Sequence, residues 1–294
     1  MVGSALRGRT IVMSGGSRGI GLAILVAAAR EGANAVLLAK TDTPDARLPG
    51  TVHTAVSAIA AAGGHAVGVI GDVRDEADVE RAVATAVERF GGVDICINNA
   101  GAINKAGTLE LPLKRFDLMQ QVNVRGTYLL TRACLPHLRQ SDHAHVLSLS
   151  PPLNLAPHWL GQFPAYTMSK YAMTLLTLGW AAEFAANKIA SDCLWPQTRI
   201  ATAVIGMLGG PDALARSRSP EIMADAAVHL LAQSPTAGTG RTLLDVEVLA
   251  AAGVTDFAKY GGGTDPTLDL YVDPPGESLS GTTDIDTERK WIER

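Results

Sequence analysis

Charged side chains are scarce in this sequence, and the excess negative charge lies at its end. Only 18% of the 294 residues are charged, and the formal net charge is −4. Residues 261–294 contain eight acidic and three basic side chains. Because no basic patch stands out, we expect no nucleic-acid partner. A chain that is 47% hydrophobic is also too apolar to be disordered.

Aromatic residues, cysteines and long apolar runs are also few. The aromatic content of 5% argues against an aromatic surface for single strands. The three cysteines, Cys96, Cys134 and Cys193, are too far apart for a zinc motif or a disulfide framework. Seven histidines show no metal-binding spacing, so we expect no metal site. No uncharged stretch approaches the ~20 residues of a membrane span, and the first apolar run is too short for a signal peptide. We therefore predict a cytoplasmic protein without a membrane partner.

Short apolar strands alternate with helical segments along most of the chain. Strands are expected at residues 10–14, 35–39, 65–70, 93–97, 144–149, 189–195 and 242–246. Helices are expected at residues 20–29, 52–62, 75–90, 113–138, 166–186 and 220–233. Parallel strands need crossover connections, and helices of this length provide them. The pattern predicts one α/β domain over residues 1–260, a doubly wound parallel sheet with helices on both faces. From residue 261 the composition changes to Gly, Asp, Thr and Pro, which predicts a loosely ordered or partner-packed acidic arm over residues 261–294.

A glycine-rich turn lies between the first strand and the first helix. Its glycines stand where a backbone turns tightly and lets a pyrophosphate approach the amides at a helix start. A Walker-type loop is excluded because no Gly-Lys-Ser/Thr follows. A glycine turn without a ligand is the alternative reading. The predicted phosphate site consists of Gly15, Ser17, Arg18, Gly19, Ile20 and Gly21.

The residues after the next three strands complete a predicted dinucleotide site. Lys40 stands where a carboxylate would bind the ribose of NAD, and with Arg18 it offers positive charge to a 2′-phosphate. NADP is therefore favoured over NAD, although the nearby Asp42 keeps NAD open. The carboxyl ends of parallel strands form the ligand crevice of doubly wound sheets. There we place Asp72, Val73, Asn98, Ala100 and Gly101.

Tyr166 and Lys170 are four residues apart in a predicted helix and therefore share one face. A phenol has a pKa near ~10, which a neighbouring ammonium and a cationic nicotinamide would lower, making Tyr166 an acid/base group. An exposed Tyr/Lys pair without chemistry is the alternative. Asn123 lies within a predicted helix although asparagine is a poor helix former. A local backbone bond is its simplest explanation.

As an ordered set, the glycine turn, Asp72, Asn98-Asn99-Ala100-Gly101, Asn123 and Tyr166-x3-Lys170 resemble the short-chain dehydrogenase/reductase family over roughly residues 6–250. The resemblance implies a seven-stranded Rossmann-type domain, usually a homodimer or homotetramer. It implies hydride transfer between a nicotinamide and a carbonyl or alcohol. It assigns the acid/base role to Tyr166, ribose anchoring to Lys170 and support of a water relay to Asn123.

Further roles follow from the same resemblance. Asp72 would meet the adenine, and Asn98 would meet the adenosine ribose or steady the central strands. In the loop after the sixth strand, Thr202 would approach the carboxamide, and Pro196, Thr198 and Ile200 are further cofactor-binding candidates. The segments 39–41, 150–154, 194–196 and 207–211 resemble the hydroxysteroid dehydrogenase-like subgroup of the family.

One departure concerns the family's substrate-orienting serine, whose position falls on Pro151. Proline offers no side-chain donor. The adjacent Ser150 could substitute and is our fourth catalytic candidate, after Tyr166, Lys170 and Asn123. A nucleotide-binding protein with weak or no catalysis, acting as a sensor or lipid binder, is therefore the alternative to an enzyme. The expected lid segments, residues 153–164 and 199–219, are rich in apolar side chains, which favours a lipid-like or sterol-like carbonyl or alcohol substrate.

Overall fold

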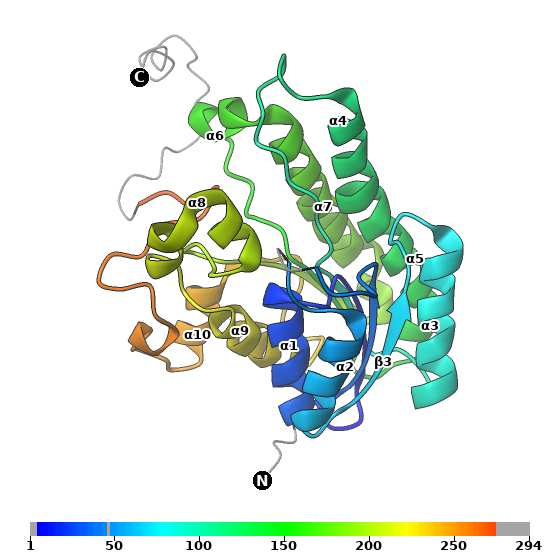
Figure 1. Cartoon of the computed structure of the whole chain (residues 1–294). Coiled ribbons are helices and arrows are strands. Elements are labelled where there is room, and N and C mark those ends of the chain that lie inside the picture. Colours follow the sequence, from blue (N-terminus) through cyan, green and yellow to red (C-terminus); the bar gives the residue numbers. More distant parts are fainter. Residues whose placement is uncertain (1–4, 46–47, 275–294) are drawn as a thin grey trace.

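The computed structural model describes residues 5–45 and 48–274 and shows a three-layer α/β domain (Figure 1). Seven strands form one sheet in the order β3-β2-β1-β4-β5-β6-β7, and every neighbouring pair is parallel. The predicted doubly wound, seven-stranded sheet is confirmed. The strands are β1 (Thr10–Ser14), β2 (Asn34–Ala39), β3 (His65–Ile70), β4 (Ile95–Asn98), β5 (His145–Ser148), β6 (Ala190–Trp195) and β7 (Thr242–Leu244).

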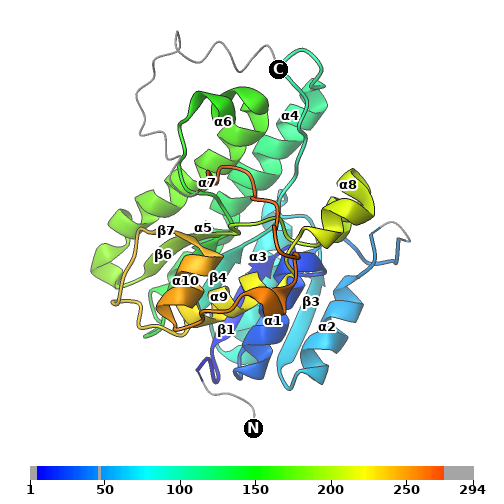
Figure 2. The ribbon, with the colours of Figure 1, turned by 90° about the vertical axis from the view of Figure 1, so that its left-hand side faces the viewer.

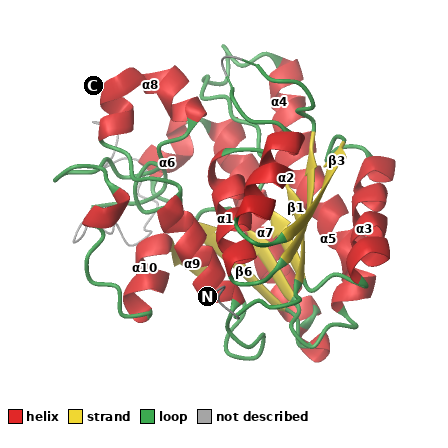
Figure 3. Ribbon diagram, turned by 60° about the horizontal axis from the view of Figure 1, so that its bottom comes forward, coloured by secondary structure: helices red, strands yellow, loops and turns green. Residues whose placement is uncertain are grey.

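Helices cover both faces of the sheet, which explains why the central strands read as continuous apolar runs. One apolar core lies under α1, α2, α9 and α10, and a second lies under α3, α5 and α7 (Figure 3). The bounds are α1 (Gly19–Arg30), α2 (Val52–Ala61), α3 (Glu76–Phe90), α4 (Leu113–Met119), α5 (Gly126–Leu138), α6 (Pro157–Gln162), α7 (Pro164–Glu183), α8 (Ala203–Ala215), α9 (Glu221–Leu231) and α10 (Asp245–Ala251). The described residues also contain two single turns of 3-10 helix, η2 (Ala185–Asn187) and η3 (Ala258–Tyr260).

Four parts of the structure differ from the sequence prediction. The long helix expected at residues 113–138 consists of α4, a π-helical segment η1 (Gln120–Arg125) and α5. The irregular segment expected after β6 contains α8, which is kinked at Gly210, just before Pro211. The short helices α6 and α10 were not predicted, because neither is long enough to show helical periodicity.

The strand order reverses at the centre of the sheet, where β1 lies between β2 and β4. Ser14 and Asn98, the last residues of β1 and β4, are paired in register. The loops that leave these two strands diverge to opposite sides, and this point is where doubly wound sheets bind ligands.

Residues 261–274 pack on the domain and are not the loosely ordered arm that the composition predicted. Leu268 forms an antiparallel bridge with Thr198, and Tyr271 is only 1% exposed. Figure 2 shows this segment, in orange to red, running from the side of α10 toward α7. The apolar side chains of Leu268, Leu270 and Tyr271 pack in a buried cluster. The Gly, Asp and Pro residues around them make this apolar pattern hard to see in the sequence. The rest of the predicted arm, residues 275–294, lies outside the described residues.

Candidate active site

The glycine turn after β1 leaves no room for side chains. Gly15 has a φ of +75°, in the left-handed region that favours glycine. A Cβ on Gly15 would lie 2.9 Å from the Cα of Ala100, and one on Gly21 would lie 2.7 Å from the carbonyl oxygen of Gly15. Such close packing lets a ligand approach the backbone, as the sequence predicted for a phosphate site.

Asn99 holds this turn in place, although the sequence analysis named it only as part of the Asn98-Asn99-Ala100-Gly101 motif and gave it no role of its own. Its Nδ2 donates to the carbonyl oxygens of Ser14, at 3.2 Å, and Gly15, at 2.8 Å. The amide thereby links the ends of β1 and β4 at the switch point. The position of Asn99 at the end of a strand was the sequence signal for a role at the site. Asn98 shows the same signal, so the sequence could not tell which of the two asparagines holds the turn.

Two cavities flank the turn. We name the first, of about 410 Å³, the Asp72 cavity, and the second, of about 570 Å³, the Thr202 cavity. Predicted cofactor residues that line the Asp72 cavity are Gly15, Ser17, Arg18, Lys40, Asp72, Val73, Ala100 and Gly101. Those that line the Thr202 cavity are Arg18, Gly19, Ile20, Gly21 and Thr202. Asn99 and Val204 line both cavities, so the turn lies between two hollows large enough for the parts of a dinucleotide.

The first turn of α1 offers backbone donors to these cavities. Arg18, the N-cap residue, makes no side-chain cap to the helix. The N–H groups at a helix start have no partner within the helix and carry the positive end of its dipole. They are therefore suited to a pyrophosphate.

Three cations surround the Asp72 cavity. Nη2 of Arg18 donates to Oγ1 of Thr41 at 3.0 Å, which fixes the guanidinium beside the end of β2. The Lys40 side chain is 63% exposed and its Nζ lies 3.4 Å from Oδ2 of Asp72. Arg74, which the sequence prediction missed, donates through Nη2 to the same oxygen at 2.6 Å. The Arg74 hydrogen bonds hold the pKa of Asp72 at about 2, so this carboxylate stays charged and can accept from an adenine amino group.

Tyr166 lies in the first turns of α7 and is 7% exposed. No group within the described ranges hydrogen-bonds to its hydroxyl. Burial in an apolar cluster, with smaller contributions from Tyr271 and Asp269, raises the pKa of this phenol well above 10. The sequence predicted that an ammonium and a bound nicotinamide would lower this pKa; among the groups of the chain itself, desolvation of the phenolate dominates and raises it.

Lys170 lies one turn further along α7, as predicted, and is also buried. Its Nζ donates to the carbonyl oxygen of Leu149 at 2.5 Å and lies 5.0 Å from the centre of the Trp195 ring. Burial lowers the pKa of Lys170 to about 8. The ammonium is therefore held at the carboxyl ends of β5 and β6, next to the crevice.

Asn123 connects this helix to the loop after β4. Its Oδ1 accepts from the N–H of Ala102 at 2.7 Å, and its Nδ2 donates to Oγ of Ser169 at 2.9 Å. Ser169 precedes Lys170, so these bonds align α7 with the cofactor loop. The π-helical turn at η1 explains how asparagine fits within a helix, and such turns often mark functional sites.

Besides Tyr166, Lys170 and Asn123, five predicted residues line neither cavity. Asn98 donates to Thr131 Oγ1 at 2.9 Å and to Ser148 Oγ at 3.3 Å, so it steadies the central strands, one of its two predicted roles. Ser150 is fully buried beside Cys193, and its hydroxyl has no hydrogen-bond partner. The predicted use of Ser150 as a substrate-orienting donor is therefore not supported. Thr198 and Ile200 are buried beneath the loop that carries Thr202. Pro196, at the start of that loop, is also buried.

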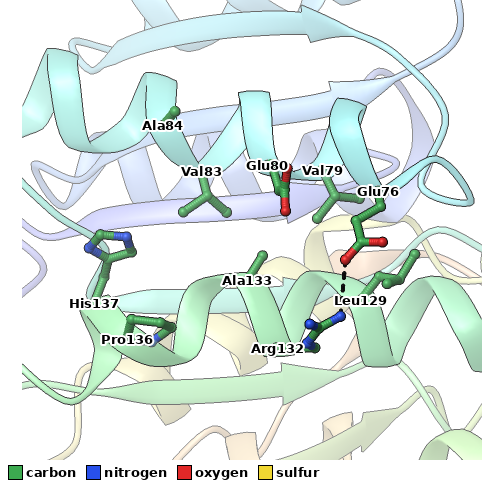
Figure 4. Close-up of a pocket in the computed structure, with 10 residues that line it drawn as sticks. All are labelled: Glu76, Val79, Glu80, Val83, Ala84, Leu129, Arg132, Ala133, Pro136 and His137. Atoms are coloured by element: carbon green, nitrogen blue, oxygen red, sulfur yellow. Dashed lines mark hydrogen bonds and ion pairs between the residues drawn. The ribbon is translucent and has the colours of Figure 1, made fainter.

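A further hollow of about 400 Å³ lies between α3 and α5, away from the glycine turn (Figure 4). Glu76 and Arg132 form an ion pair of 3.0 Å across its rim. None of the predicted site residues lines this hollow. In the part of the chain that the structure describes, no cluster of three potential metal ligands occurs, and no helix is long and apolar enough to cross a bilayer.

Comparison with known proteins gives consistent matches. The family model for short chain dehydrogenases matches residues 9–204. Hydroxysteroid dehydrogenase-like protein 2 of Danio rerio is 49% identical over 276 residues, covering 93% of this chain and 66% of that protein. The Homo sapiens protein of that name is 46% identical over 277 residues, which cover 94% of this chain and 66% of that protein. This chain thus spans slightly less than two thirds of the length of these relatives. Their names agree with the resemblance of the sequence to the hydroxysteroid dehydrogenase-like subgroup.

Solved structures match the fold as well. A short chain dehydrogenase from Mycobacterium thermoresistibile has 51% identity and a TM-score of 0.87, covering 92% of this chain and 98% of that one. A short-chain dehydrogenase/reductase variant from Serratia marcescens has 29% identity and a TM-score of 0.70, covering 82% of this chain and 97% of that one.

Proposed function

The chain belongs to the short-chain dehydrogenase family, and from this premise we propose an NADP-dependent oxidoreductase that acts on the carbonyl or alcohol group of an apolar substrate. One observation carries the proposal. Asn123 donates to Ser169 and the carbonyl of Leu149 accepts from Lys170, and these bonds tie the helix of Tyr166 and Lys170 to the loops at the carboxyl ends of β4 and β5. The nicotinamide, when bound, supplies or accepts the hydride.

The side chains of the chain supply the remaining chemistry. Tyr166 holds its proton on Oη and can donate it to the oxygen of a carbonyl that is being reduced. Lys170 would hold the nicotinamide ribose. The glycine turn would bind the pyrophosphate through backbone donors, because its shape excludes side chains at Gly15 and Gly21.

The charge around the Asp72 cavity supports NADP over NAD. Replacing Lys40 with aspartate should weaken NADPH binding ~10- to 100-fold, the loss expected for a charge-assisted hydrogen bond. The variant should then bind NADH as tightly as NADPH, or more tightly. Quenching of tryptophan fluorescence measures both dissociation constants. Lys114→Asp, at an exposed position on α4, is the matched control and should change neither. Unchanged NADPH binding by the Lys40 variant would remove this residue from the site.

Apolar surface beside Tyr166 supports an apolar substrate. Tyr166 belongs to a buried cluster with Met119, Tyr171 and Trp195. A hollow of about 370 Å³ between the loop after β4 and the start of α7 is lined by Ala106, Thr108, Leu111, Leu113, Phe116, Pro164, Ala165 and Met168. Exposed leucines at 153, 155 and 160 lie at the predicted lid.

A screen of aldehydes, ketones and alcohols for oxidation of NADPH or reduction of NADP tests the proposal. We expect turnover to be fastest with aliphatic or alicyclic compounds. Saturable NADPH binding without turnover of any of them would favour the alternative of a nucleotide-binding protein, which Pro151 and the burial of Ser150 motivate.

Exposed apolar side chains on α5 and α7 support a homo-oligomer. Tyr128, Met168 and Leu175 are 48–58% exposed on these two helices. Exposed apolar side chains on neighbouring helices are a common feature of subunit contacts. We expect Leu175→Asp to shift the mass measured by light scattering to the 30.7 kDa of one chain. A wild-type chain already at that mass would contradict the oligomer. The cytoplasmic location remains a prediction.

A further inference from the structure

The segment of residues 265–273 joins the two sides of the Tyr166 site. At one end, the Asp273 carboxylate accepts from Nδ2 of Asn154 at 2.6 Å and from Nε1 of Trp159 at 2.8 Å. Both donors belong to the region between β5 and α7. At the other end, the segment pairs with the backbone after β6. The segment therefore runs from the loop after β6 to the region before α7, and it lies beyond the part of the chain that the family model covers.

The pairing after β6 determines where the side chain of Asp269 points. Its N–H donates to the carbonyl oxygen of Gln197 at 3.0 Å, and the N–H of Arg199 donates to the carbonyl oxygen of Thr267 at 2.9 Å. These bonds frame the Thr198 and Leu268 bridge. Side chains alternate along such a ribbon, so Arg199 and Asp269 lie on one face, opposite the buried Thr198.

Neighbouring contacts place Asp269 close to the catalytic pair. The carbonyl oxygen of the next residue, Leu270, accepts from Nε1 of Trp195 at 2.9 Å. The Lys170 ammonium lies over the ring of the same tryptophan. Among the described residues, the only hydrogen bond to the Asp269 carboxyl comes from the N–H of Leu270, at 2.7 Å. A carboxyl can accept several more, so Asp269 has capacity for a ligand.

Charged and titratable side chains from several elements act on the carboxyl of Asp269. Burial raises its pKa to about 6, against the opposing effects of Lys105, Arg199 and Lys170. Tyr166, Tyr271 and Asp245 are the other titratable groups that interact with it. None of the cations forms an ion pair with Asp269 within 4 Å in the described part of the chain. Asp269 is half-buried. A desolvated carboxyl without such a partner destabilises the fold and is typical of functional sites.

We propose that Asp269 is a substrate-binding residue of this site. Its carboxyl hydrogen-bonds a polar group of the substrate next to the reacting carbon, where this chain has Pro151 and a buried Ser150 in place of an accessible serine. The inference rests on the proposed function, and it makes the substrate an apolar molecule that carries a hydroxyl or an amide N–H beside the reacting group, since a carboxylate accepts hydrogen bonds.

Asp269→Asn tests the proposal, with Asp265→Asn as the matched control. Asp265 lies in the same segment, but it is 86% exposed and pairs with Arg216 on the surface. With acetoin and decanal as the polar and apolar carbonyl probes, we expect Asp269→Asn to lower kcat/KM for acetoin ~10²-fold, near the loss of one hydrogen bond to a charged acceptor. The acid limb of the pH profile, near pH 6, should disappear. Decanal turnover and NADPH binding should change less than ~3-fold.

Thermal stability gives a readout that needs no turnover. The pKa of Asp269 lies above that of an unfolded aspartate, so the ionised group destabilises the fold above pH 6 and this penalty is lost as the pH falls through that value. At pH 8 we expect Asp269→Asn to raise Tm by ~2–6 °C, and the advantage should vanish near pH 4. A merely structural residue would lower Tm when replaced.

The outcomes separate this inference from the proposed function. Loss of acetoin turnover with a raised Tm supports Asp269 as a substrate-binding residue. If Asp269→Asn keeps the wild-type kcat/KM and pH profile for acetoin, or if its Tm falls at pH 8, the inference is overturned while the oxidoreductase stands. If the wild-type chain reduces neither probe, a raised Tm still supports an active-site carboxyl and a lowered Tm overturns it, whereas the carbonyl screen decides the proposed function.

Discussion

Replacing Tyr166 with phenylalanine is expected to lower kcat/KM ~10²- to 10⁴-fold, the range of a lost general acid. The substitution removes only the hydroxyl and leaves the ring in its apolar cluster. The hydroxyl makes no hydrogen bond to a described residue, so its removal leaves no buried partner unsatisfied and should cost little stability. Steady-state NADPH oxidation with the best carbonyl of the screen gives the comparison.

The cofactor affinity distinguishes this effect from a general disturbance of the site. The Kd for NADPH should change less than ~3-fold in Tyr166→Phe, because Tyr166 is expected to act on the substrate oxygen. Tyr128→Phe, at an exposed position on α5, is the matched control and should retain wild-type turnover. Wild-type turnover by Tyr166→Phe would remove Tyr166 from the chemistry.

Replacing Gly21 with alanine is expected to weaken NADPH binding by ~10²-fold or more, equivalent to ~3 kcal/mol. The added Cβ would lie 2.5 Å from Nδ2 of Asn99 and 2.7 Å from the carbonyl oxygen of Gly15. Neither neighbour can move freely, because the Asn99 amide also holds the end of β1. The turn must therefore open, and its backbone donors would leave the positions that a pyrophosphate needs.

Gly179→Ala provides the control for adding a methyl group to a helix. A Cβ at this exposed position on α7 meets no atom within 4 Å, so binding should be unchanged and stability slightly raised. Circular dichroism checks that both variants fold. Wild-type NADPH affinity in a folded Gly21→Ala chain would show that the turn does not bind the phosphates.

Local features of the chain were predictable from the sequence. The glycine turn, Lys40, Asp72 and the Tyr166/Lys170 spacing follow from short-range rules of backbone geometry, and the structure places all of them at the carboxyl edge of the sheet. Asn99 and Arg74 were missed because neighbouring residues showed the same polar signal, and only the path of the loops decides which side chain faces the crevice.

Features that depend on distant segments could not be predicted. Ser150 is one residue from the position expected for a serine, yet the backbone turns it inward beside Cys193. The phenol of Tyr166 was expected to meet mainly Lys170, whereas Tyr271 and Asp269 also surround it. Both residues come from the segment after residue 260, where a composition of Gly, Asp and Pro hides the apolar side chains that pack on the domain.

Calorimetric titration of the wild-type chain with NADPH tests most directly whether the glycine turn holds a dinucleotide. The account predicts saturable heat, one site per chain and an affinity at least ~10-fold higher than for NADH. A titration that shows no saturable heat with either nucleotide, on a folded protein, would contradict the account.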